Sequence, residues 1–149
     1  KMRSKQGTWH RMGDLGYLDN QGRLWFCGRK SHRVTSSAGD YFPVPIESIF
    51  NQHSSIRRSA LVGIGPRSNQ EMVLILEPVL KTLLNDRSQQ LKVLKELIEI
   101  ASPYDSASKV KHFLWHPCLP TDIRHNAKIF REKLSQWAEK QTITDSSLL

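Results

Sequence analysis

The strongest folding signal in this chain is an amphipathic stretch at residues 88–101. Its apolar side chains recur at helical spacing, and they are Leu91, Leu94, Leu97, Ile98 and Ala101. Lysines and glutamates occupy the opposite side, so the stretch predicts a surface helix with one apolar stripe. Because such a stripe is stable only when it is covered, the rest of the chain must supply a second layer.

Two β-rich runs, residues 56–64 and 71–76, supply that layer. They are separated by residues 65–69, a Gly-Pro-Arg-Ser-Asn sequence typical of a turn. Two apolar runs joined by turn residues predict paired strands with a hairpin loop between them. Residues 110–115 form a third strand candidate.

Two more helices are expected around this sheet. Pro45 stands where a helix can begin without losing a hydrogen bond, and apolar residues follow it at helical spacing until an expected end near residues 52–54. A last helix is expected at residues 129–140. The predicted fold class is α+β: an N-terminal β-hairpin, a hinge, then a small mixed three-stranded sheet packed with about three helices.

The N-terminal hairpin is predicted from a turn. Residues 19–22, Asp-Asn-Gln-Gly, place Asp at the turn start and Gly where a positive φ is tolerated, between β-prone residues 17–18 and 23–27. Residues 28–39 show little apolar periodicity and are expected to be a linker that bends. A β-prone run follows at residues 40–44.

Composition narrows the class of protein without naming one. The 149 residues with 38% hydrophobic content predict a globular chain, and no apolar run approaches the roughly 20 residues of a membrane span. The first ten residues also lack a secretory signal, so a cytoplasmic location is the default. Cys27 and Cys118 are expected to be idle thiols. A start at Lys1 suggests a segment of a longer protein.

Charge points to anionic partners. The 22 Lys and Arg against 14 Asp and Glu give a formal net charge of +8. Such a balance attracts nucleotides, coenzyme A, nucleic acid or an acidic neighbouring domain, without choosing among them.

A set of ordered motifs resembles the C-terminal lid of the adenylate-forming superfamily, which includes acyl-CoA synthetases, peptide-synthetase adenylation domains and luciferases. The resemblance covers almost the whole chain. It rests on residues 9–17, 28–29, 43–47, 102–104, 119–120 and 126–129. Residues 25–34 and 124–128 look most like fatty-acyl ligases, including the β-lactone synthetases of bacterial olefin biosynthesis.

The resemblance implies roles for three residues. Asp14 would accept hydrogen bonds from both ribose hydroxyls of ATP or AMP, and Arg29 would reach the ribose or phosphate region. Lys128 would be the catalytic cation, approaching the α-phosphate and the substrate carboxylate. No glycine-rich phosphate loop occurs in the sequence, so ATP and Mg²⁺ would be held mainly by a large N-terminal adenylation domain of the same parent chain. The chain alone is therefore expected to be inactive.

Lids of this superfamily also rotate between two half-reactions, and the pattern puts Ser31 at the hinge. Family members usually carry Asp or Lys there, Lys at Thr35, Gly at Ala38 and Thr at Met12. These departures cluster on the face used in the second step. Coenzyme A use is therefore left open, and the product is either a thioester or a β-lactone.

The resemblance divides the chain into three parts. Residues 1–28 would be the end of the large domain with the β-hairpin, residues 29–141 the lid domain and residues 142–149 a tail. The predicted function is that of a lid fragment of an ATP-dependent ligase that activates a fatty or β-hydroxy fatty acid as its acyl adenylate.

Two other interpretations were weighed. Arg57, Arg58, Lys109 and Lys111 suggest a non-catalytic basic module for nucleic acid or a carrier protein, but no nucleic-acid fold signature accompanies them. His112 and His116 have a helical metal spacing but fall in and beside a predicted strand, so no metal site is expected.

Overall fold

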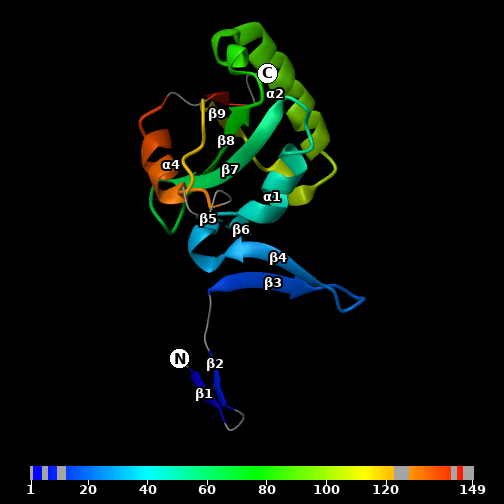
Figure 1. Ribbon diagram of the computed structural model, residues 1–149, viewed down its shortest axis with the longest axis vertical. Coiled ribbons are helices and arrows are strands. Elements are labelled where there is room, and N and C mark those ends of the chain that lie inside the picture. The colour runs from blue at the N-terminus through cyan, green and yellow to red at the C-terminus, as the bar shows by residue number, and fades with distance from the viewer. Residues whose placement is uncertain (1, 5–6, 10–12, 123–127, 142–143, 146–149) are drawn as a thin grey trace.

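The computed structural model describes residues 2–4, 7–9, 13–122, 128–141 and 144–145 of the chain. Figure 1 shows a compact body of sheet and helices, with two hairpins leading away from it toward the N-terminus. The body contains β7 (Ile56–Ile64), β8 (Glu71–Pro78), β9 (His112–Trp115), α1 (Pro43–Phe50), α2 (Arg87–Ala101), α3 (Asp105–Ser108) and α4 (Arg131–Ala138), with the short 3-10 helix η2 (Lys81–Asn85). The hairpins are β1 (Met2–Ser4) with β2 (Gly7–Trp9) and β3 (Asp14–Leu18) with β4 (Leu24–Arg29).

The central sheet has the order β10-β9-β8-β7, where β10 is the two-residue strand Thr144–Asp145. β7 and β8 are antiparallel, as the hairpin prediction required, and β8 and β9 are parallel. The three long strands confirm the predicted small mixed sheet. β10 pairs antiparallel with β9 inside the range predicted to be a tail.

Helices cover both faces of this sheet. Alternation along β8 sends Leu74 and Leu76 into the cluster under α1 and α2, and Val73 and Ile75 into the cluster under α4. All four are fully buried. The amphipathic helix predicted at residues 88–101 is α2, with Asp86 as its N-cap, accepting a hydrogen bond from Gln89 N–H at 3.0 Å.

The prediction that residues 28–39 form an unpacked linker is wrong. That segment contains a 3-10 helix, η1 (Lys30–His32), and the first of two short paired strands, β5 (Val34–Ser36) and β6 (Gly39–Tyr41). Tertiary contacts stabilise them: Gln70 N–H donates to Thr35 O at 2.7 Å, and Val34 is buried. α1 begins at Pro43 rather than Pro45, and α4 begins at Arg131 because Ile129 forms a β-bridge with Thr121.

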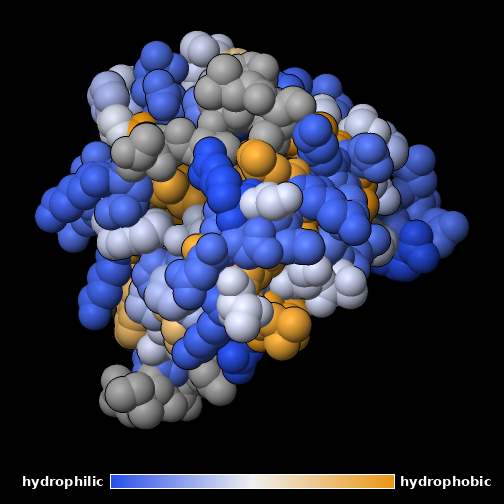
Figure 2. Space-filling view, turned by 90° about the horizontal axis from the view of Figure 1, so that it is seen from above, coloured by the Kyte–Doolittle hydropathy of each residue, from blue (hydrophilic) through white to orange (hydrophobic). Residues whose placement is uncertain are grey.

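The surface seen in Figure 2 is mostly hydrophilic, with small hydrophobic areas between charged side chains. No helix among the described residues combines the length and apolarity that crossing a membrane requires.

Candidate functional site

Asp14 and Arg29 face each other across the second hairpin. They are register partners at the open end of β3 and β4, and Arg29 Nε lies 3.5 Å from Asp14 Oδ1. The Asp14 side chain is 38% exposed and that of Arg29 51%, so both remain accessible to a ligand. The hairpin that the turn at residues 19–22 predicts therefore brings together two residues that the sequence singled out separately.

That turn is fixed by one carboxylate. Asp19 accepts hydrogen bonds from Gln21 N–H, Arg23 N–H, Arg23 Nε and Trp25 Nε1. These donors, that of Trp25 first, lower the pKa of Asp19 to about 2. Gly22 has the predicted positive φ, 76°. The turn thus keeps β3 and β4 in the register that aligns Asp14 with Arg29.

Ser31 lies directly after this hairpin, in η1, and is exposed. The preceding Gly28 has a φ of 107°, and an added Cβ would lie 3.2 Å from Val44 Cγ2, so this position favours glycine on two grounds. Lys30 N–H donates to Gly13 O at 2.8 Å, which ties η1 to the hairpin. The predicted hinge therefore follows a strand position in β4 that requires special backbone geometry.

A hollow of about 790 Å³ opens between η1, the edge of β7, the β7–β8 loop and α4. Its cationic and imidazole side chains are Arg29, Lys30, His32, Arg33, Arg67 and Arg131. Glu132 adds one acid to this lining. Arg33 pairs with Asp40 at 2.9 Å and Arg131 pairs with Glu47, so part of this positive charge is compensated. Lys30, Arg67 and the half-exposed Arg29 are the cations that suit the hollow to an anionic ligand.

The pKa of His32, which lines the hollow, is lowered in this surrounding. Burial lowers its pKa below the ordinary 6.5, and the nearby Arg131, Arg29 and Lys128 charges lower it further, against an opposing effect of Glu132. Its Nε2 lies 3.7 Å from Glu132 Oε1, so η1 touches the first turn of α4. η1, which contains the predicted hinge residue Ser31, therefore lies against α4.

Lys128 is exposed and directly precedes the residue that pairs with Thr121. Its carbonyl accepts from Asp122 N–H at 3.0 Å. The neighbouring motif residues 124–127 lie outside the described residues, as does Met12. The structure thus fixes the backbone of Lys128 and leaves its side chain exposed.

Sequence reasoning missed His32, Arg67 and Arg131. Arg131 lies close to Lys128 in the sequence but outside the motifs that carry the resemblance, and it begins α4. His32 and Arg67 had no sequence signal. They line the hollow because the segments around η1 and α4 pack against β7 and the β7–β8 loop.

Three of the four residues of the basic-module interpretation form ion pairs. Arg57 and Arg58 both pair with Glu77, at 3.5 and 2.9 Å, and Lys109 pairs with Asp105 at 2.8 Å. These three cations therefore do not form an open patch for phosphates.

His112 is the first residue of β9, and His116 lies one position beyond the end of that strand. His116 packs edge-on against Trp137, with ring centres 4.7 Å apart, and its Nδ1 accepts from Cys118 N–H. Within the described ranges, no group of three or more His, Cys, Asp or Glu side chains is arranged to hold a metal ion.

Comparison with known proteins places the chain in a family. No protein-family model matches it. It is 43% identical over 134 residues to the olefin beta-lactone synthetase of Xanthomonas campestris pv. campestris, covering 90% of this chain and 24% of that protein. The same-named protein of Stenotrophomonas maltophilia is 45% identical over 132 residues, covering 89% and 23%.

Solved structures agree on the fold. The amide bond synthetase McbA from Marinactinospora thermotolerans superposes with a TM-score of 0.68 at 19% identity, covering 87% of this chain and 25% of that one. ATP-bound MatB from Rhodopseudomonas palustris gives 0.68 at 18%, covering 92% and 25%. The chain spans about a quarter of the length of these relatives. We conclude that it belongs to the adenylate-forming ligase superfamily, with the sequence and fold of that superfamily's lid segment.

Proposed function

We propose that this chain is the lid of an ATP-dependent ligase, here called the parent, which activates a fatty or β-hydroxy fatty acid as its acyl adenylate. The observation that carries the proposal is the Asp14–Arg29 pair at 3.5 Å beside a hollow lined by cations. This constellation combines a ribose acceptor with phosphate-binding guanidinium groups.

Asp14 and Arg29 would bind the nucleotide. A carboxylate has two acceptor oxygens, which suits two adjacent ribose hydroxyls, and the contact with Arg29 orients it. The planar guanidinium of Arg29 retains donors for a phosphate or ribose oxygen while it holds Asp14.

Lys128 would act on the reacting atoms. The substrate carboxylate oxygen attacks the α-phosphorus of ATP, the bond to the bridging oxygen breaks, and pyrophosphate leaves with the electron pair. Negative charge accumulates on the phosphoryl oxygens during this step, and a preorganised ammonium stabilises it. Rotation about Ser31 would then withdraw Lys128 and present the opposite face of the lid.

The second half-reaction would release AMP. Either the β-hydroxyl of the acyl group or the thiol of coenzyme A attacks the carbonyl and loses its proton. The names of the two curated relatives favour the first, because a β-lactone is the internal ester of a β-hydroxy acid. We propose β-lactone formation as the product step and the thioester as its alternative.

The remainder of the parent would supply Mg²⁺, the phosphate loop and the acyl site, and it would cover the second hairpin. Apolar side chains on this hairpin are largely exposed, and they are Tyr17, Leu18, Leu24, Trp25 and Phe26. A two-stranded hairpin is marginal alone in water, so these side chains favour a large neighbouring domain. The two free thiols, Cys27 and Cys118, support a reducing compartment, for which we propose the cytoplasm.

Product analysis tests this proposal. The parent is incubated with ATP, Mg²⁺ and either a plain or a β-hydroxy fatty acid, with and without coenzyme A, and the products are identified by mass spectrometry. Acid-dependent pyrophosphate release with an acyl adenylate or β-lactone is expected. Absence of pyrophosphate release with every acid would contradict the proposal, as would clear turnover by the 149-residue chain alone.

A further inference from the structure

Lys128 lies on a loop that the structure closes at its base. Thr121 and Ile129 form an antiparallel bridge, and Phe130 N–H donates to Pro120 O at 2.9 Å. With the bond from Asp122 N–H to Lys128 O, these contacts form a short ladder. The position of the Lys128 backbone therefore depends on where the two chains entering this ladder are held.

The incoming chain is held by a buried carboxylate. Glu77, at the end of β8, is 1% exposed, and its Oε2 accepts from Leu119 N–H at 2.7 Å. The same oxygen accepts from Arg58 Nε at 2.9 Å, while Arg57 lies 3.5 Å from Oε1. Leu119 is itself 1% exposed, so this end of the loop is fixed by both packing and a charge-assisted hydrogen bond.

The outgoing chain is held by a second buried carboxylate on the other side of the sheet edge. Glu47, on α1, is 7% exposed and receives both terminal nitrogens of Arg131, the first residue of α4, with Nη2 to Oε2 at 2.9 Å. Leu61 N–H donates to Glu47 Oε1 at 2.6 Å, and Arg131 donates to Leu61 O at 3.3 Å. Leu61, on the edge strand β7, thus has both its backbone N–H and its backbone carbonyl hydrogen-bonded in this cluster.

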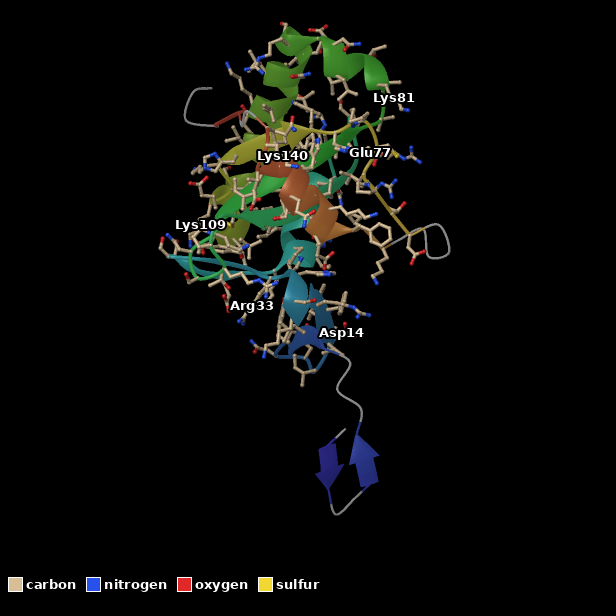
Figure 3. All side chains as sticks on the ribbon, turned by 90° about the vertical axis from the view of Figure 1, so that its left-hand side faces the viewer. Asp14, Arg33, Glu77, Lys81, Lys109 and Lys140 are labelled. Carbon is tan, nitrogen blue, oxygen red and sulfur yellow. The ribbon has the colours of Figure 1, made fainter. Side chains whose placement is uncertain are left out.

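A contribution to folding stability does not by itself explain why Glu47 and Glu77 are buried carboxylates. Removing a carboxylate from water is costly, and apolar replacements of buried ion pairs are often neutral or stabilising. A fork-like pair fixes geometry, however, and a misplacement of about 1 Å at a catalytic group can reduce the rate about 100-fold. Figure 3 shows Glu77 in the lid body, apart from Asp14 on the hairpin, so its contribution to the site is through the loop.

We propose that Glu47 and Glu77 are positioning residues, which fix the Lys128 loop at its two ends so that the ammonium reaches the phosphoryl group. This inference rests on the proposed role of Lys128. It assigns each carboxylate to adenylation and not to the second half-reaction.

The test uses the parent with Glu47→Gln and Glu77→Gln, which keep side-chain shape but replace one acceptor oxygen with a donor. Acid-dependent exchange of pyrophosphate into ATP should fall about 10- to 100-fold through kcat, with the Kd of ATP changed less than about threefold. Consumption of a supplied acyl adenylate should also change less than about threefold. Gln90→Met is the matched control, because Gln90 is buried and its side chain donates to the carbonyls of Leu83 and Leu84, away from the Lys128 loop.

A double substitution separates positioning from general stability. If Glu77 acts through Lys128, Lys128→Ala with Glu77→Gln should lose no more exchange activity than Lys128→Ala alone. Multiplied losses would overturn the inference, as would losses in both half-reactions that match the Gln90→Met control at equal Tm. If Glu77→Gln fails to fold, Arg131→Lys retains the charge at the other anchor and should still reduce exchange selectively.

The two proposals fail in different ways. A parent in which Lys128→Ala retains full exchange would refute the role of Lys128 itself. A parent in which Lys128→Ala is inactive but Glu47→Gln and Glu77→Gln are unaffected would refute only the positioning.

Discussion

The second hairpin and the lid body differ in how their side chains are satisfied. In the body, β8 is buried on both faces and its neighbours hold buried ion pairs, whereas on the hairpin Leu24 is 74% exposed and Phe26 55%. The body therefore contains its own core, while the hairpin contains site residues and an uncovered apolar surface. The proposed nucleotide-binding residues therefore lie on the hairpin and the proposed catalytic lysine on the body, which differ in how well their apolar side chains are covered and are joined through η1.

The largest expected effect is on the stability of the body. Leu74→Ala, at a fully buried position, should lower the free energy of unfolding of the 149-residue chain by about 2–5 kcal/mol. Leu24→Ala should change it by less than about 0.5 kcal/mol, because that side chain is mostly in water. Urea denaturation measures both.

The same pair of substitutions in the parent sharpens the comparison. There Leu24→Ala should become destabilising, since a neighbouring domain would cover the hairpin. Equal effects of Leu24→Ala in chain and parent would mean that the hairpin surface is not an interface.

Nucleotide binding should depend on the hairpin. Asp14→Asn in the parent should lower kcat/KM for ATP by about 10- to 100-fold, since hydrogen bonds to a charged group contribute about 1.5–3 kcal/mol. Steady-state kinetics at varied ATP measure the loss. Asp19→Asn is the control, because Asp19 holds the turn but lies at the opposite end of the strands. If both substitutions cause the same loss, Asp14 acts on hairpin structure and not on ribose.

A smaller effect concerns pH and the contact between η1 and α4. The pKa of His32 is lowered in the folded chain, so the unfolded chain binds more protons below about pH 6.5. Stability should therefore rise as the pH increases toward that value and decrease in acid. His32→Gln should flatten part of this dependence in thermal denaturation, and the rest should persist because burial also lowers the pKa of His116. An unchanged pH profile would show that neither burial nor the charges of Arg131, Arg29 and Lys128 lower the pKa of His32.

Regular elements were predictable because their periodicity is a property of the sequence. The β7 range was predicted to the residue and α2 to within one residue at its start. Long apolar patterns indicate the type of element without information about the rest of the fold. β5 was missed because three residues carry no period, and the β-prone run expected at residues 40–44 overlaps β6, which ends at Tyr41 before α1 begins at Pro43. β5 forms through contacts such as Gln70 N–H to Thr35 O.

The site was predictable only where neighbours in a hairpin bring it together. Asp14 and Arg29 follow from the turn, whereas the approach of His32 to Glu132 needs α4 to lie along the edge of β7. Ser135 Oγ holds it there through a 2.6 Å bond to Gly63 O, a contact between residues 72 positions apart. Such side-chain bonds to an edge strand leave no local sequence signal.

The central claim is that the lid delivers the Lys128 cation to the reacting phosphoryl group. Its most direct test compares Lys128→Ala with wild type in the parent, measuring single-turnover formation of acyl adenylate and the Kd of ATP separately. The account predicts a rate loss of roughly 100- to 1,000-fold with a much smaller change in ATP affinity. An equal loss in both, or no loss in rate, would contradict it.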